Sequence, residues 1–149
     1  MGMSMDEGAA ERLAHAIRRA SVAVVACKRQ ALRDLDLTVP QYEALRLLCA
    51  TDGMSAAQLA RQCTVTPQTM ATVISNLEQK AFVERRSSPL HQKVLVVSIT
   101  HSGREASGYA DKAVLAAVGK LLNCFSGEEA ARFEGFLERA VSALEDPTV

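Results

Sequence analysis

Apolar residues recur with a helical period over most of the chain, and the pattern changes to that of strands only near its middle. From Glu11 to about Leu35 they return every three or four positions, which predicts a long amphipathic helix. The segment "LDLT" ends it, and a second helix is expected with Thr38 as its N-cap and Pro40 in its first turn. The side chains predicted to face inward from this second helix are Tyr42, Leu45 and Leu48.

Two shorter helices are predicted next, separated by the segment "TVT". The first begins with Ser55 as N-cap and has Gln58 three residues later, which is the capping-box pattern. The second has Thr66 as N-cap and Pro67 at its first position, and its buried face is predicted to hold Met70, Val73, Ile74 and Leu77. Two short helices joined by a tight turn, the second with a polar outer face, form a helix-turn-helix arrangement.

The pattern then changes to two segments rich in β-branched residues, "FVERR" and "KVLVVSI", joined by the loop "SSPLHQ". They predict a two-stranded hairpin, or wing, attached to the preceding helices. A long helix is expected from a cap at Thr100 to about Asn123, with Tyr109, Ala113, Val114, Ala117 and Leu121 on its apolar stripe. A last helix is expected from a cap at Ser126, with Glu129 as its box partner. Core positions are also assigned to the aromatic residues Tyr42, Phe125, Phe133 and Phe136.

The predicted fold class is mainly α with a small β-wing. Residues 37–100 form a winged helix-turn-helix DNA-binding lobe, and residues 1–36 and 101–149 supply a helical dimerisation layer. The first and the last two helices could cover one another within one chain. Their apolar stripes are longer than one small core needs, which favours a layer built from two interdigitating copies, and hence a homodimer.

Composition narrows the function. The chain has 149 residues and zero formal net charge, but residues 54–104 carry six Lys and Arg against two Asp and Glu, a local charge of +4. The four cysteines form no C-x-x-C pair, and no segment reads as a signal core or a membrane span, so a cytoplasmic protein with reduced thiols is expected. No metal-spaced cluster, nucleophile elbow or phosphate loop is present, which argues against an enzyme, a metal or a cofactor.

The second helix of the helix-turn-helix is the candidate DNA reader. No residue from Gln62 to Leu77 is charged, and amide and hydroxyl side chains are suited to hydrogen bonding with base edges in the major groove. The candidate base-reading residues are Gln68, Thr69, Thr72, Ser75 and Asn76. The candidates for the DNA backbone and the wing are Arg61, Thr66, Arg85, Arg86, His91 and Lys93, which would supply affinity and salt dependence.

Three segments in this order resemble the corresponding segments of the MarR (multiple antibiotic resistance regulator) family: "LTVPQYEALRLL", "SAAQLARQCTVTPQTMATVISNLEQKAFVERR" and "VSITHSGRE". The resemblance covers nearly the whole chain and is strongest from Leu37 to Glu105. There are two departures. The wing tip reads His91-Gln92-Lys93 where the family usually has Asp-x-Arg, and the recognition helix has Ala71-Thr72 where many members have Thr-Arg.

The resemblance implies a dimeric, sequence-specific regulator of transcription that binds a palindromic duplex, as a repressor relieved by a small aromatic ligand. Tyr42 is a candidate border of a ligand cavity between the two parts of the molecule, and no ligand residue is assigned. A thiol-based redox sensor is one alternative, but Cys27 lies on the apolar stripe eleven residues before Thr38, which favours packing. A winged-helix module that binds proteins and not DNA is the second alternative.

Overall fold

The computed structural model describes residues 3–88 and 95–145, with side chains from Gly8 onward. Its helices are α1 (Met3–Leu32), α2 (Val39–Cys49), α3 (Ala56–Gln62), α4 (Pro67–Gln79), α5 (His101–Val118) and α6 (Gly127–Glu145). Short 3-10 turns, η1 (Arg33–Leu35) and η2 (Gly119–Asn123), follow α1 and α5. The strands β1 (Val83–Ser87) and β2 (Leu95–Ile99) pair antiparallel, with Val83 opposite Ile99. The predicted fold class, mainly α with a small β-wing, is confirmed.

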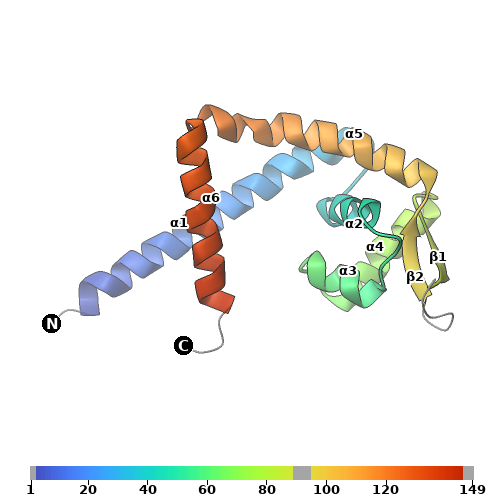
Figure 1. The fold of residues 1–149 in the computed structure, drawn as a ribbon, viewed down its shortest axis with the longest axis horizontal. Coiled ribbons are helices and arrows are strands. Elements are labelled where there is room, and N and C mark those ends of the chain that lie inside the picture. The colour runs from blue at the N-terminus through green and yellow to red at the C-terminus, as the bar shows by residue number, and fades with distance from the viewer. Residues whose placement is uncertain (1–2, 89–94, 146–149) are drawn as a thin grey trace.

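The molecule has two parts, which Figure 1 shows together. Helices α2, α3 and α4 and the β-hairpin gather at one end, and we call this part the lobe. Helices α1 and α5 pack along each other and against α2, and both extend away from the lobe. Helix α6 turns back sharply from the end of α5, and none of its residues is buried.

The hydrophobic core lies in the lobe and at its junction with α1 and α5, and it is aliphatic as the composition indicates. The predicted inward faces of α2 and α4 are confirmed, because Tyr42, Leu45 and Leu48 are buried together with Met70, Val73, Ile74 and Leu77. These two faces meet around Leu59 of α3 and Leu32 of α1. The position of α4 is therefore set by apolar burial on one side only, and its other side is exposed to solvent.

Helix starts agree closely with the sequence. Thr38, Ser55, Thr66 and Thr100 each accept the backbone N–H of the residue three positions later. Such caps satisfy one of the free N–H groups of a helix end. Ser126 and Glu129 exchange reciprocal bonds in the same way, and the Ser126 backbone N–H that donates to the Glu129 carboxylate holds the pKa of that carboxyl below its usual range.

The end of the wing is locked to the start of α5. Thr100 donates its hydroxyl to the Ala81 carbonyl at 2.7 Å, and its backbone N–H donates to the Phe82 carbonyl at 3.0 Å. Gly103 then passes so close that an added Cβ would lie 2.0 Å from the Phe82 oxygen. The T-x-x-G spacing in "ITHSGRE" therefore has a packing reason, because only glycine permits this approach.

The predictions about the ends of α1 and α5, the buried face of α5 and the aromatic part of the core were wrong. Helix α1 begins at Met3 and ends at Leu32, earlier at both ends than expected, and α5 ends at Val118 before a 3-10 turn. The buried face of α5 contains Gly103, Ser107, Ala110 and Val114, whereas Tyr109 and Leu121 of the predicted stripe are exposed. The aromatic residues predicted as core are also exposed in the single chain: Phe125, Phe133 and Phe136.

The errors about which residues are buried have one physical cause. The apolar period locates whatever surface a helix buries, in its own chain or in a partner. Here the stripes of α1, α5 and α6 extend beyond the lobe, and many exposed apolar residues lie on them, including Leu13, Tyr109, Phe133 and Val141. The reading in which these helices cover one another within one chain is therefore wrong for α6.

Candidate nucleic-acid interface

Helices α3 and α4 are joined by a short turn that is fixed at both ends. Ser55 and Gln58 exchange hydrogen bonds at the start of α3, which confirms the predicted capping box. Between the helices, Thr64 adopts a positive φ of 54°, and Val65 donates its N–H to the Ala60 carbonyl at 3.0 Å. This geometry reverses the chain within a few residues, so α4 leaves the turn with its first residues at the surface.

The two faces of α4 differ completely in character. One is buried by Met70, Val73, Ile74 and Leu77, at the spacing of a helix that packs on one side. The other is exposed and uncharged, and all five predicted base-reading residues belong to it: Gln68, Thr69, Thr72, Ser75 and Asn76. Gln68, Thr72 and Ser75 follow one another at steps of four and three, so they form a single outward row.

The hydroxyl groups at the start of α4 have defined partners. Thr66 accepts the Thr69 N–H at 3.1 Å and donates its own proton to the Thr69 hydroxyl oxygen at 2.9 Å. Thr72 donates to the Gln68 carbonyl at 3.3 Å. The outward proton of Thr69 is therefore free to donate, whereas Thr72 presents an acceptor oxygen and a methyl group.

The predicted backbone cations differ in what they contact. Arg61 lies exposed at the end of α3 and has no side-chain partner in the part of the chain that the structure describes. Arg85, on β1, donates to Glu78 of α4 at 3.1 Å. Two of the predicted wing residues, His91 and Lys93, lie outside the described residues.

Arg86 holds the base of the wing. Its Nε donates to the Ser98 hydroxyl at 2.6 Å, and its guanidinium also donates to the carbonyl of Asp52 in the turn before α3. The Ser98 hydroxyl donates to the same Asp52 carbonyl at 3.2 Å. Beside them, Met54 exchanges two backbone hydrogen bonds with Val97. The hairpin is thus fixed to the α2–α3 turn, and this clamp could not be read from the sequence because its partners are distant in the chain.

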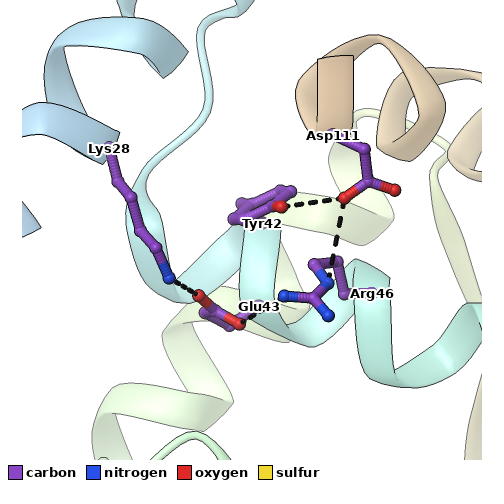
Figure 2. Close-up of polar contacts among 5 residues, drawn as sticks. All are labelled: Lys28, Tyr42, Glu43, Arg46 and Asp111. Carbon is purple, nitrogen blue, oxygen red and sulfur yellow. Dashed lines mark hydrogen bonds and ion pairs between the residues drawn. The ribbon is translucent and has the colours of Figure 1, made fainter. Parts of the chain in front are cut away.

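A polar network joins α2 to both long helices, and Figure 2 shows its members. Lys28 of α1 contacts Glu43 at 2.6 Å. On the other side, Tyr42 donates its hydroxyl to Asp111 of α5 at 2.8 Å, and Arg46 lies 3.8 Å from the same carboxylate oxygen. Burial, together with the hydrogen bond to Asp111, raises the pKa of the Tyr42 phenol to about 12.

This network connects the lobe to the α1–α5 layer. Sequence reasoning placed Tyr42 in the core and missed its bond to Asp111, because nothing local indicates a partner 69 residues away. Sequence reasoning also missed the ion pair in which Lys80, at the end of α4, contacts Asp36 at 2.7 Å. These pairs fix where the lobe lies relative to the long helices, and hence where α4 points.

Other chemistries find no support in the described residues. Within residues 3–88 and 95–145, no group of three or more His, Cys, Asp or Glu side chains could hold a metal ion. The same part of the chain contains no helix long and apolar enough to cross a membrane. Cys27, the candidate thiol sensor, is a partly buried free thiol on α1.

The fold and this interface define a winged helix-turn-helix DNA-binding protein. The MarR family signature matches residues 37–94. The HTH-type transcriptional repressor Rv2887 of Mycobacterium tuberculosis is 36% identical over 109 residues, which cover 73% of this chain and 78% of the repressor. The chain therefore belongs to the MarR family. It is a dimeric DNA-binding transcriptional regulator and not an enzyme.

Solved structures agree with this assignment. The crystal structure of Rv2887 superposes with a TM-score of 0.69 at 31% identity, and the match covers 94% of this chain and 98% of Rv2887. Rv2887 has also been solved in complex with DNA and with salicylic acid, each with a TM-score of 0.71. CouR from Rhodococcus jostii RHA1, bound to p-coumaroyl-CoA, matches with a TM-score of 0.80 over 92% of this chain and 94% of CouR. Its 20% identity shows the fold alone.

Proposed function

We propose that this protein is a repressor that binds a palindromic operator as a homodimer, with α4 in the major groove, and that a small ligand relieves the repression. The observation that carries the proposal is the exposed, uncharged face of α4, which begins at the Thr66 cap. Rv2887, which supports this reading, is named as a repressor and has been solved with DNA and with salicylic acid. Because the operator DNA of a bacterial repressor lies in the cytoplasm, we place this protein in the cytoplasm.

We assign the reading of bases to the outward row of α4, which is formed by Gln68, Thr72 and Ser75. Gln68, in the first turn, can pair through both amide atoms with an adenine. Thr69 is suited to donate to a base acceptor, and Thr72 to accept a proton or contact a thymine methyl group, given their internal bonds. Ser75 continues the row, and Asn76 flanks it closer to α1 and α2.

Backbone contacts come from the groups around α4. The Thr66 end of the helix presents the Gln68 N–H and a partial positive charge to a phosphate, since Pro67 has no N–H and the Thr69 N–H is bonded to the Thr66 cap. Arg61, at the end of α3, has no ion-pair partner among the described residues and is the candidate there, and His91 and Lys93 are the candidates at the wing tip. Arg85 contacts Glu78 through its Nε, so that carboxylate offsets part of the positive charge that Arg85 would present to a phosphate, and Arg86 acts mainly by holding the wing in place.

The geometry of the dimer sets the distance between the two α4 helices. Two copies that bury the exposed apolar faces of α1, α5 and α6 against each other would place their α4 helices about one turn of DNA apart, roughly 34 Å. The operator would then be a palindrome of roughly 16–20 bp. A ligand that favours a different spacing would lower DNA affinity by shifting the population of conformers.

Selection of bound sequences from a random duplex library tests this proposal. We expect enrichment of a two-fold symmetric site, and binding to it that weakens steeply with salt. Enrichment of an asymmetric sequence would contradict the dimeric geometry. A folded protein that binds no duplex at low ionic strength would support the alternative of a protein-interaction module.

A further inference from the structure

The outward face of α4 lacks the side chains that most often recognise guanine. Arg and Lys make the commonest specific contact with that base, through its O6 and N7 atoms in the major groove. Helix α4 contains neither residue, and Lys80, at its C-cap, is paired with Asp36 at 2.7 Å. The amide and methyl groups that this face does carry are matched to adenine and thymine instead.

Thr72 lies at the centre of this face, opposite the buried side of the helix. Its hydroxyl donates to the Gln68 carbonyl, one helical turn earlier, at 3.3 Å. The hydroxyl is thus held against the helix backbone and its proton is already used. The methyl group is therefore the part of the Thr72 side chain that is free to meet a base edge.

Two neighbours of Thr72 extend this surface. Ala71 is exposed, and it lies three residues after Gln68 and four before Ser75, so the three side chains adjoin on the helix. The Ala71 methyl group adds apolar area beside Thr72. The side-chain amide of Gln68 has no hydrogen-bond partner among the described residues, which leaves both of its polar atoms for an adenine. An amide next to two methyl groups fits an adenine edge next to a thymine methyl group.

We propose that α4 reads a thymine through its 5-methyl group, with Thr72 as the specificity-determining residue, Ala71 beside it and Gln68 on a neighbouring adenine. This role rests on the proposed function, because it names the kind of operator that the repressor selects. Thymine differs from uracil only by this methyl group, and 5-methylcytosine carries the same group on cytosine. At the contacted position the protein should therefore bind thymine more tightly than uracil, and 5-methylcytosine more tightly than cytosine.

The first experiment replaces thymines of the selected operator with deoxyuridine, one position at a time and symmetrically in both half-sites. Loss of one methyl contact should weaken binding about fourfold for each half-site, equivalent to about 0.8 kcal/mol, and hence about fifteenfold for the symmetric change. Fluorescence anisotropy of labelled duplexes with the full-length protein, at one salt concentration, measures the affinities. The proposal is overturned if no substitution weakens binding by more than about twofold, or if the selected half-sites contain no thymine.

A matched pair of variants assigns the methyl contact to Thr72. Thr72→Ser removes the methyl group and keeps the hydroxyl, whereas Thr72→Val keeps the methyl group and replaces the hydroxyl. At one operator position, the ratio of affinities for thymine and uracil should fall toward one in Thr72→Ser and stay at the wild-type value in Thr72→Val. Because each ratio is taken within one protein, a loss of folded protein cancels.

Two results would contradict the assignment to Thr72. An unchanged ratio in Thr72→Ser would mean that the thymine methyl group acts through the shape of the duplex and not through this side chain. A ratio that is lost in Thr72→Val and kept in Thr72→Ser would identify the hydroxyl as the reading group.

Methylated DNA gives an independent check at the position that deoxyuridine identifies. The T·A pair there is replaced in both half-sites by C·G, with either cytosine or 5-methylcytosine. The methylated duplex should bind wild-type protein about fifteenfold more tightly than the unmethylated one, and Thr72→Ser should reduce this difference. Equal binding of the two duplexes by wild-type protein would overturn the proposal, because the methyl group occupies the same place on both bases.

The outcomes separate this role from the proposed function. If the protein binds its selected operator but does not respond to the methyl groups, α4 does not read thymine in this way and the repressor function stands. If the folded protein binds no duplex at low ionic strength, the proposed function fails, and the role of Thr72 fails with it.

Discussion

Tyr42 and Asp111 join the lobe to the α1–α5 layer through a 2.8 Å hydrogen bond between the phenol hydroxyl and the carboxylate. Tyr42 is buried on α2, and Asp111 lies half-buried on α5 beside Arg46. Removal of the hydroxyl in Tyr42→Phe leaves the apolar packing in place but deprives the carboxylate of its donor. We expect a loss of about 1 kcal/mol in the free energy of unfolding, measured by urea denaturation.

The control for this substitution is Tyr109→Phe, because Tyr109 is 64% exposed on the same α5. It should change stability by much less than Tyr42→Phe.

Alkaline pH provides a second check, since the folded-state pKa of Tyr42 is about 12, raised above its ordinary value of 10.0. A raised pKa contributes stability that is fully present below pH 10 and is lost as the pH rises toward 12. The stability difference between wild type and Tyr42→Phe should therefore narrow over that interval, and a constant difference would contradict the assignment.

The Tyr42–Asp111 bond joins residues that are far apart in the sequence, and such contacts could not be predicted from local patterns. Caps such as Thr66, the buried face of α4 and the hairpin depend on neighbours a few residues away, and all were predicted correctly. The clamp made by Arg86 and the Asp36–Lys80 pair depend on residues 34 and 44 positions apart, which no local pattern encodes. The aromatic residues of the last helix were misassigned to the core because an apolar stripe shows that a face is apolar and not whether this chain covers it, and no residue of α6 is buried in the single chain.

Thr72→Ala should change operator preference without weakening the fold. The substitution removes the outward oxygen and methyl group that we assign to base contact, so discrimination at one position of each half-site should fall by about 1 kcal/mol. Competition binding with single-base operator variants measures this. Thr51→Ala is a matched control, because Thr51 is also exposed and donates to the carbonyl four residues earlier, at 3.4 Å against 3.3 Å for Thr72. If both variants keep the wild-type preference, Thr72 does not read a base.

Glu78→Gln should tighten DNA binding. Glu78 pairs with Arg85 at 3.1 Å, so neutralising the carboxylate frees the guanidinium for a phosphate. One additional phosphate contact steepens the dependence of log affinity on log salt by about 0.9. Glu84→Gln removes the same charge from β1, where Glu84 has no ion pair within the described residues, and it controls for the general effect of charge. Equal salt slopes in the two variants would show that Arg85 makes no such contact.

Gly103→Ala should destabilise the protein strongly. The added Cβ would lie 2.0 Å from the Phe82 oxygen and 2.8 Å from Ile99, and the first of these is backbone that cannot rotate away. We expect a loss of about 3 kcal/mol, seen as a lower midpoint of thermal unfolding. Gly108→Ala on the same helix meets nothing within 4 Å in this chain and should instead stabilise the helix by about 0.5–1 kcal/mol. Similar stabilities for the two variants would mean that the wing and α5 are not packed as described.

Phe136→Glu should dissociate the dimer. Phe136 is 52% exposed on α6, where its ring centroid lies 5.7 Å from the Arg139 guanidinium, and no residue of that helix is buried in the single chain. In a monomer, a charged residue at so exposed a position would change stability little. In a dimer that buries this face, it would place a carboxylate in an apolar interface and raise the dissociation constant at least tenfold.

Sedimentation equilibrium over a range of concentrations measures the dissociation constant of the dimer. Leu95→Glu, at a site 62% exposed at the start of β2, is the control and should leave the dimer intact. A Phe136→Glu protein that associates as tightly as wild type would exclude this face of α6 from the interface.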